Sequence, residues 1–141
     1  VNVAGCIRAP SVEVTEERFP LFVVNHELRP GSAGYGQWRF GLGAVCEIIY
    51  EGEGEASMNT AGDGVKVPPF GLFGGSPGLP HRYSLVSNGT ERVLRTKETG
   101  VPVFPGDSII ALSSGGGGYG DPQDRDEESQ AWDEKNGYAT K

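Results

Sequence analysis

Four consecutive glycines at positions 115–118 constrain this chain more than any other feature of its sequence. They belong to a ten-residue stretch, 113–122, in which half of the residues are glycine. Glycine tolerates positive φ and lets other backbone approach closely. Ordering a glycine costs more chain entropy than ordering other residues, so a flexible linker is a poor use for so many. The run therefore predicts an ordered region whose working surface is the backbone itself.

Two uses of the run Gly115, Gly116, Gly117 and Gly118 are open. Backbone N–H groups in such a run can form an anion-binding nest, or the run can lie close against the backbone of another chain. The Gly-Lys-Ser/Thr ending and following helix of a phosphate loop are absent, which favours the close approach. Tyr119 is expected to pack beside it. Valine at positions 116 and 117 is expected to disrupt assembly, because β-branched residues disfavour positive φ.

Two upstream segments have the same glycine-rich character. Segment 31–43 mixes its glycines with aromatic residues and is flanked by two arginines, whereas segment 68–78 mixes them with prolines and apolar residues. The first predicts either an aromatic wall facing an interface or substrate, or a kinked turn that packs its own aromatics. The second predicts turns and hydrophobic packing. The candidate interface residues are Arg29, Tyr35, Trp38, Arg39, Phe40, Phe70 and Phe73.

The two arginines offer a second kind of contact. Arg29 and Arg39 are each able to bind a carboxylate or phosphate through two parallel hydrogen bonds. Ion pairs with nearby glutamates are the favoured prediction for both.

The rest of the chain predicts a mainly β fold. Short β-rich runs alternate with Gly, Pro and Asn-Gly turn signals, as in a small sandwich or barrel-like domain with long loops. Residues 44–51 and 55–60 are expected to pair as a hairpin around Gly52 and Gly54. Residues 11–20 read as a short helix capped by Ser11 or as a strand. The expected strands are 21–28, 44–51, 55–60, 83–86, 91–94, 101–104 and 107–113.

Composition divides the chain into two parts. Hydrophobic residues make up only 36% of the chain, and its 23 glycines and 10 prolines lie among 13 aromatic residues. This composition predicts a loop-rich domain over residues 1–122, with a modest core that a partner completes. Residues 123–141 are acidic and nearly free of aliphatic side chains. They predict a tail that is extended or bound to a partner, with Trp132 and Tyr138 as its anchors.

Several functional classes are disfavoured. A net charge of −7 without a basic patch argues against nucleic acid and anionic membranes as partners, and no apolar run is long enough for a membrane span. Two separated cysteines favour a reduced, cytoplasmic location. No metal site or complete catalytic set is predicted, because the only Cys and His residues lack ligand spacing: Cys6, His26, Cys46 and His81.

The three glycine-rich segments, in this order and spacing, resemble the C-terminal part of the hydantoinase B/oxoprolinase family over residues 11 to 122. This resemblance implies a subunit of a hetero-oligomer with hydantoinase-A-like and hydantoinase-B-like partners. It further implies ATP-dependent, biotin-independent carboxylation of an acetophenone-type aromatic ketone, with this chain as a small, gamma-type subunit that completes a larger hydantoinase-B-like one. ATP and a divalent metal are then expected on other subunits, and this chain alone is not expected to be catalytic.

Two alternatives remain open. One is a split subunit of an ATP-dependent hydantoinase or 5-oxoprolinase, which opens a cyclic amide. The other is a stand-alone β binding module without a catalytic partner.

Overall fold

The computed structural model describes residues 10–138. Its first element is the helix α1 (Val12–Arg18), and the Ser11 hydroxyl accepts a 3.4 Å hydrogen bond from the Val14 N–H. The helix alternative for residues 11–20 is therefore confirmed, and the strand alternative is wrong. Ser11 is a good N-cap, and Phe19 leaves the helix in an extended conformation just before Pro20.

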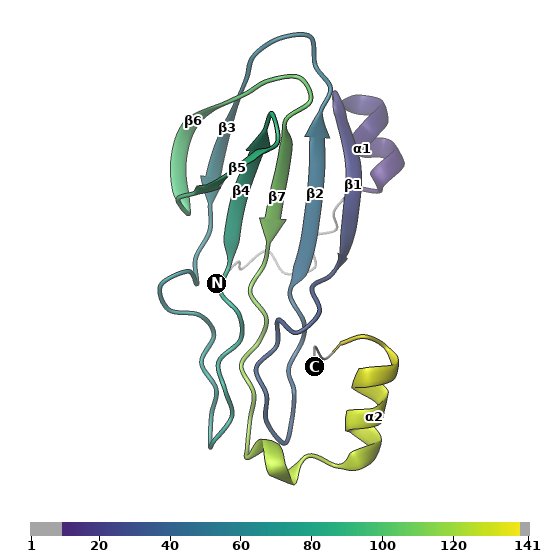
Figure 1. The fold of residues 1–141 in the computed structure, drawn as a ribbon, viewed down its shortest axis with the longest axis vertical. Helices are drawn as coiled ribbons and strands as arrows, with labels where there is room; N and C mark the ends of the chain where they lie inside the picture. The colour runs from purple at the N-terminus through teal and green to yellow at the C-terminus, as the bar shows by residue number, and fades with distance from the viewer. Residues whose placement is uncertain (1–9, 139–141) are drawn as a thin grey trace.

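Seven antiparallel strands form two sheets (Figure 1). The larger sheet has the order β1-β2-β7-β4-β5, and the smaller one pairs β3 with β6. The bounds are β1 (Leu21–Leu28), β2 (Ala44–Tyr50), β3 (Ala56–Ala61), β4 (Arg82–Ser87), β5 (Thr90–Leu94), β6 (Lys97–Val103) and β7 (Ser108–Leu112).

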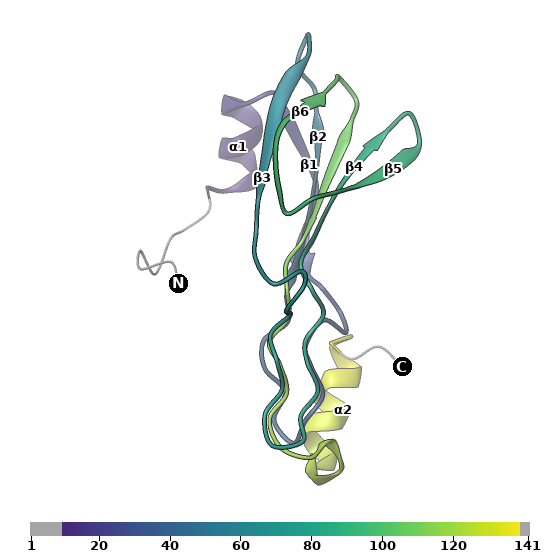
Figure 2. The same ribbon diagram turned by 90° about the vertical axis from the view of Figure 1, so that its left-hand side faces the viewer.

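The core lies between the two sheets. Leu85 and Leu94 of the larger sheet pack against Val101 and Val103 of the smaller one, and all four are at most 6% exposed. Figure 2 shows the smaller sheet on one side of the larger. The mainly β prediction is confirmed in its sandwich form, since the sheets of residues 10–138 do not close into a barrel.

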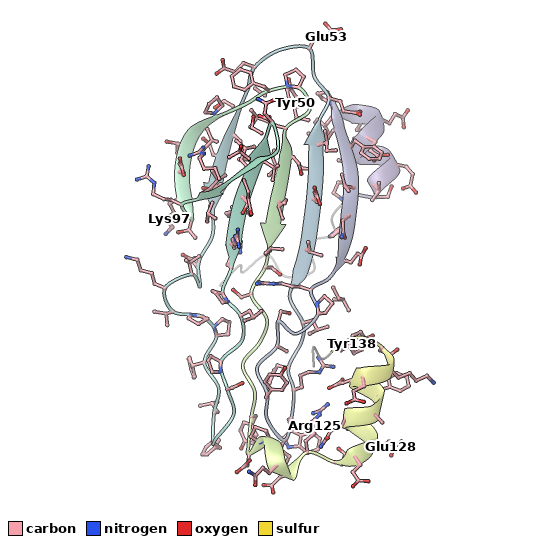
Figure 3. All side chains as sticks on the ribbon, in the orientation of Figure 1. Tyr50, Glu53, Lys97, Arg125, Glu128 and Tyr138 are labelled. Carbon is pink, nitrogen blue, oxygen red and sulfur yellow. The ribbon has the colours of Figure 1, made fainter. Side chains whose placement is uncertain are left out.

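One predicted pairing is wrong. Strand β2 pairs with β1 and β7, whereas β3 pairs with β6 in the other sheet. The connection around Glu53 is an arch between sheets (Figure 3) and not a tight hairpin turn. The apolar strand β2 sits inside its sheet with a neighbour on each edge, which leaves no edge for β3. The hairpin at Asn88-Gly89 is confirmed, with positive φ of 49° and 75°.

The acidic tail was expected to be extended or bound to a partner; it forms a helix, and binding to a partner stays a prediction. A short 3₁₀ turn, η1 (Pro122–Asp124), is followed by α2 (Glu127–Lys135). The Asp126 carboxylate caps α2 by accepting a 2.8 Å hydrogen bond from the Ser129 N–H. Acidic residues in its first turn and Lys135 in its last match the helix dipole. The helix has no apolar stripe, and charge attaches it to the rest of the chain, as described below.

Candidate functional site

The three glycine-rich segments come together as one unit, here called the glycine bundle (residues 31–43, 67–80 and 113–121). In Figures 1 and 2 its extended segments continue below the sheets. Segments 31–43 and 67–80 each double back, and segment 113–121 runs between them. Backbone hydrogen bonds join all three: Leu72 N–H donates to Gly118 O at 2.9 Å, and Gly34 N–H donates to Gly116 O at 2.8 Å.

Contacts inside the glycine bundle repeat every three residues. Gly115 and Gly118 lie against the carbonyls of Ser32 and Tyr35, so close that a Cβ at either glycine would overlap them. The same two carbonyls accept hydrogen bonds of 2.7 Å from N–H groups that are also three residues apart, on Leu79 and Ser76. Three residues per turn is the period of the polyproline II helix, which packs closely against others only where glycine removes the side chain.

The four-glycine run lies at the centre of this packing. A Cβ on Gly116 would meet the Phe40 side chain, and a Cβ on Gly117 would meet the Phe70 carbonyl. The predicted close approach is therefore present, but its partners are segments of the same chain. None of the four glycines has positive φ, so the conformational reason for glycine at 116 and 117 is wrong. Glycine is required at these positions because there is no room for a Cβ, and not because of the backbone conformation.

Because glycine fills the interior, the aromatic side chains of the glycine bundle point outward. Tyr35, Trp38 and Phe40 are 53%, 58% and 56% exposed, and Phe70 and Phe73 are 72% and 77% exposed. Tyr119 is 39% exposed and lies 5.2 Å from Phe73 between ring centroids. The alternative in which segment 31–43 packs its own aromatics is wrong. Their role at an interface stays a prediction.

A buried ionic cluster fastens α2 to the glycine bundle. Arg39 binds Asp133 through two hydrogen bonds of 2.9 Å, and Arg125 donates a third, of 2.7 Å, to the same carboxylate. Asp133 is only 5% exposed. Burial raises its pKa, but the hydrogen bonds and charges of the two arginines outweigh burial and lower the pKa below its ordinary value. Figure 3 shows Arg125 beside the start of α2.

The partners of the two flanking arginines differ from the expected glutamates. Arg39 does bind a carboxylate bidentately, but that of Asp133, which lies 94 residues along the chain. Arg29 donates to the backbone carbonyls of Pro80 and Ser113 at 2.8 and 3.1 Å. Arg29 therefore links two segments of the glycine bundle by donating hydrogen bonds to a backbone carbonyl of each.

A hollow of about 280 Å³ is lined by residues of both α2 and the glycine bundle. Its charged lining comprises Arg39, Arg125, Asp133 and Glu134, with two basic and two acidic groups. Arg39 and Arg125 already direct their donors to Asp133 and backbone carbonyls. The lining includes no serine, cysteine or histidine.

The histidines and the described cysteine lie elsewhere. His81 was expected to be exposed, but it is half-buried with its ring 4.3 Å from that of Tyr83. Burial lowers the pKa of His81, and the charge of Arg29 lowers it further. Cys46 pairs across the sheet with His26, and burial raises the pKa of its thiol. Cys6 lies outside the described residues. Between residues 10 and 138, no three His, Cys, Asp or Glu side chains are grouped to hold a metal, and no helix is long and apolar enough to cross a membrane.

The chain has clear relatives among curated proteins. It is 31% identical over 132 residues to the B subunit of a putative D-/L-hydantoinase from Pseudomonas sp. strain NS671, covering 92% of this chain and 22% of that one. It is also 31% identical over 163 residues to the acetophenone carboxylase delta subunit of Aromatoleum aromaticum, covering 94% and 24%. This relative is a delta subunit, and a gamma-type assignment stays a prediction. The chain thus spans about a quarter or less of these relatives.

Solved structures share the fold. A nucleotide-free acetone carboxylase superposes with a TM-score of 0.78 at 21% identity, covering 95% of this chain and 22% of that one. The ATP-dependent caprolactamase of Pseudomonas jessenii gives 0.79 at 24% identity, covering 94% and 23%.

The family comparison agrees with both results. Residues 1–122 match the model of the family described as hydantoinase B/oxoprolinase, and the matched residues end just before α2. The matched part contains both sheets and the whole glycine bundle. The chain is therefore related to subunits of ATP-dependent carboxylases and amidohydrolases, and it belongs to the hydantoinase B/oxoprolinase family.

Proposed function

We propose that this chain is a structural part of an ATP-dependent, biotin-independent enzyme, in which it completes a larger hydantoinase-B-like subunit. The observation that carries the proposal is the glycine bundle, with an interior closed by glycine and an aromatic exterior exposed to solvent. Exposed apolar surface of this kind is typical of interaction sites. The relatives, about four or more times longer, contain the additional protein that would cover it.

The proposed reaction is carboxylation of an aromatic ketone of the acetophenone type. ATP would phosphorylate bicarbonate and the enolate oxygen of the ketone. The enolate carbon would then bond to the carboxyl carbon as the bond from that carbon to its phosphate oxygen breaks. Hydrolysis of the phosphate on the enol oxygen by water would leave a β-keto carboxylate and a second phosphate. We place ATP, a divalent metal and the catalytic groups on hydantoinase-A-like and hydantoinase-B-like partners in the cytoplasm. The acetophenone carboxylase delta subunit among the relatives supports this choice.

A second candidate is ATP-driven opening of a cyclic amide. It is supported by relatives named for that chemistry, including the hydantoinase subunit of Pseudomonas sp. and a 5-oxoprolinase of Pestalotiopsis fici, which is 32% identical over 130 residues. The two candidates share the same structural role for this chain and differ in the substrate and in the reaction.

The test is purification of the tagged chain from its own host at moderate salt. We expect a large assembly that contains hydantoinase-A-like and hydantoinase-B-like chains, identified by mass spectrometry. A monomer near the chain mass of 14.9 kDa with cooperative unfolding would instead support a stand-alone binding module.

Phosphate release from ATP then separates the two reactions in the purified assembly. Release that requires both bicarbonate and acetophenone supports carboxylation. Release with 5-oxoproline or a hydantoin and no bicarbonate supports ring opening and excludes the ketone.

A further inference from the structure

The segment of residues 67–79, here called the outer hairpin, forms one edge of the glycine bundle. No charged side chain occurs in it, although charged residues make up 22% of the whole chain. Exposed surfaces of free proteins normally mix many charges with few large apolar groups. Yet the outer hairpin exposes five large apolar side chains: Val67 by 76%, Phe70 by 72%, Leu72 by 48%, Phe73 by 77% and Leu79 by 43%.

The turn of the outer hairpin holds Phe73 in an unfavourable conformation. Phe73 and Gly74 have φ of 51° and 98°, and the Gly75 N–H donates to the Leu72 carbonyl at 3.0 Å. These are features of a type I′ turn, whose first central position favours Asn, Asp or Gly. Phenylalanine there has no side-chain oxygen to bond locally and is strained at positive φ.

A second turn in the same chain can be compared with the turn at Phe73. The β4–β5 hairpin has two positive-φ central residues of the same kind, and there the first is Asn88, with φ of 49°. One turn thus uses the residue that suits the conformation, and the other uses a strained aromatic residue. The Phe73 ring is mostly exposed and contacts the ring of Tyr119 at the surface. Burial within this chain therefore does not offset the strain.

We propose that the outer hairpin is the surface on which the larger hydantoinase-B-like chain docks, with Phe73 as the anchor that enters an apolar pocket of that chain. This inference rests on the proposed function. The absence of charge on the outer hairpin fits an apolar protein surface and does not fit nucleic acid. The backbone hydrogen bonds of the glycine bundle fix the turn before binding, so little entropy is lost when Phe73 docks.

The occupant follows from the comparisons and from the placement of α2. In the relatives, the matched region is about a quarter or less of one polypeptide, so the remaining three quarters or more are available to cover it. In Figure 1, α2 lies beside the opposite edge of the glycine bundle from the outer hairpin. The chain thus covers one edge with its own charged helix and leaves the uncharged edge for the partner.

The experiment compares two variants in the assembly purified from the host. Phe73→Asn gives the outer hairpin the residue that the other turn uses, and Asn88→Phe places the same strain in the β4–β5 hairpin. We expect F73N to keep or raise the melting temperature of the chain and to weaken binding to the larger hydantoinase-B-like chain about thirtyfold or more. We expect N88F to lower the melting temperature and to leave binding unchanged. Wild-type binding by a folded F73N variant overturns the proposal.

A photoreactive benzoylphenylalanine at position 73 identifies the occupant directly. A cross-link to the larger hydantoinase-B-like chain supports the proposal. A cross-link only to a second copy of this chain, or to neither, overturns it. If no hydantoinase-B-like chain is present in the wild-type assembly, the proposed function itself fails. If that chain is present but insensitive to F73N, only this inference fails.

Discussion

Replacing Gly117 by alanine tests whether close backbone packing holds the glycine bundle together. A Cβ at position 117 would overlap the Phe70 carbonyl oxygen and lie only 2.5 Å from its carbonyl carbon. Gly41, in the same bundle, has nothing within 4 Å of the position of its Cβ. Neither glycine has positive φ, so alanine suits the backbone conformation at both positions. The two substitutions therefore differ in the space available and not in chemistry.

The expected free-energy changes have opposite signs. Overpacking costs about 1–3 kcal/mol even where side chains can move, and here the obstacle is backbone. Moving segment 113–121 away from Phe70 also strains the hydrogen bonds of 2.8 and 2.9 Å that Gly118 and Gly116 donate to Ser76 and Gly41, worth about 1 kcal/mol each. We expect Gly117→Ala to cost about 3–5 kcal/mol. Gly41→Ala should stabilise by about 0.4–1 kcal/mol, because alanine restricts the unfolded chain.

Thermal unfolding followed by circular dichroism gives the comparison. At about 4 °C per kcal/mol for a domain of this size, Gly117→Ala should lower the melting temperature by about 10–20 °C and Gly41→Ala should raise it slightly. Hydrogen exchange should show the loss of protection at the amides of Gly116 and Gly118. Melting temperatures within about 2 °C of each other for the two variants would refute the packing argument.

Three further predictions concern the charged and titratable groups. Arg39→Lys removes the two parallel hydrogen bonds to Asp133, so docking of α2 should weaken by about 1.5–3 kcal/mol, seen as faster hydrogen exchange in α2; unchanged exchange would contradict the role of the cluster. The lowered pKa of Asp133 means that its stabilising contribution is complete above the ordinary value of about 3.9 and is lost as the pH falls through the lowered value; Trp132 fluorescence, read from pH 7 to pH 2, should therefore change only below about pH 4, and a transition above pH 5 would count against this. Burial raises the pKa of the Cys46 thiol, so iodoacetamide should modify Cys46 more slowly at pH 8 than it modifies free cysteine, as measured by peptide mapping, and an equal rate would argue against burial.

Local signals are enough to predict much of the sandwich. Residues 21–28 are predicted with the observed bounds, because Pro20 and Pro30 punctuate a β-rich run. The Asn88-Gly89 turn is predicted from its dipeptide alone. Strand β6 begins at Lys97, earlier than the expected residue 101, because its first half is polar and is ordered only by pairing with β3. Pairing between distant segments leaves no such local pattern.

The candidate site is harder to predict for a related reason. The aromatic residues of segment 31–43 and the four glycines stand out in the sequence, but backbone-to-backbone hydrogen bonds carry no side-chain pattern that would name their partners. The cluster of Arg125 and Asp133 with Arg39 escapes prediction, since the lack of apolar residues in the tail argues against a docked helix. The signals that could have found it are the cap at Asp126 and the acidic first turn of α2.

The central position of residues 113–121 has a consequence for the order of folding. The hairpins at 31–43 and 67–80 lack the central segment that packs against both of them until the chain has been synthesised beyond residue 121, and the contact between Arg29 and Ser113 spans 84 residues. Contacts of such long range close slowly. Until then, the two hairpins remain exposed apolar segments. A chain in that state is prone to aggregate or to recruit chaperones. The glycine bundle is therefore expected to form after the first strands and to govern the yield of folded protein.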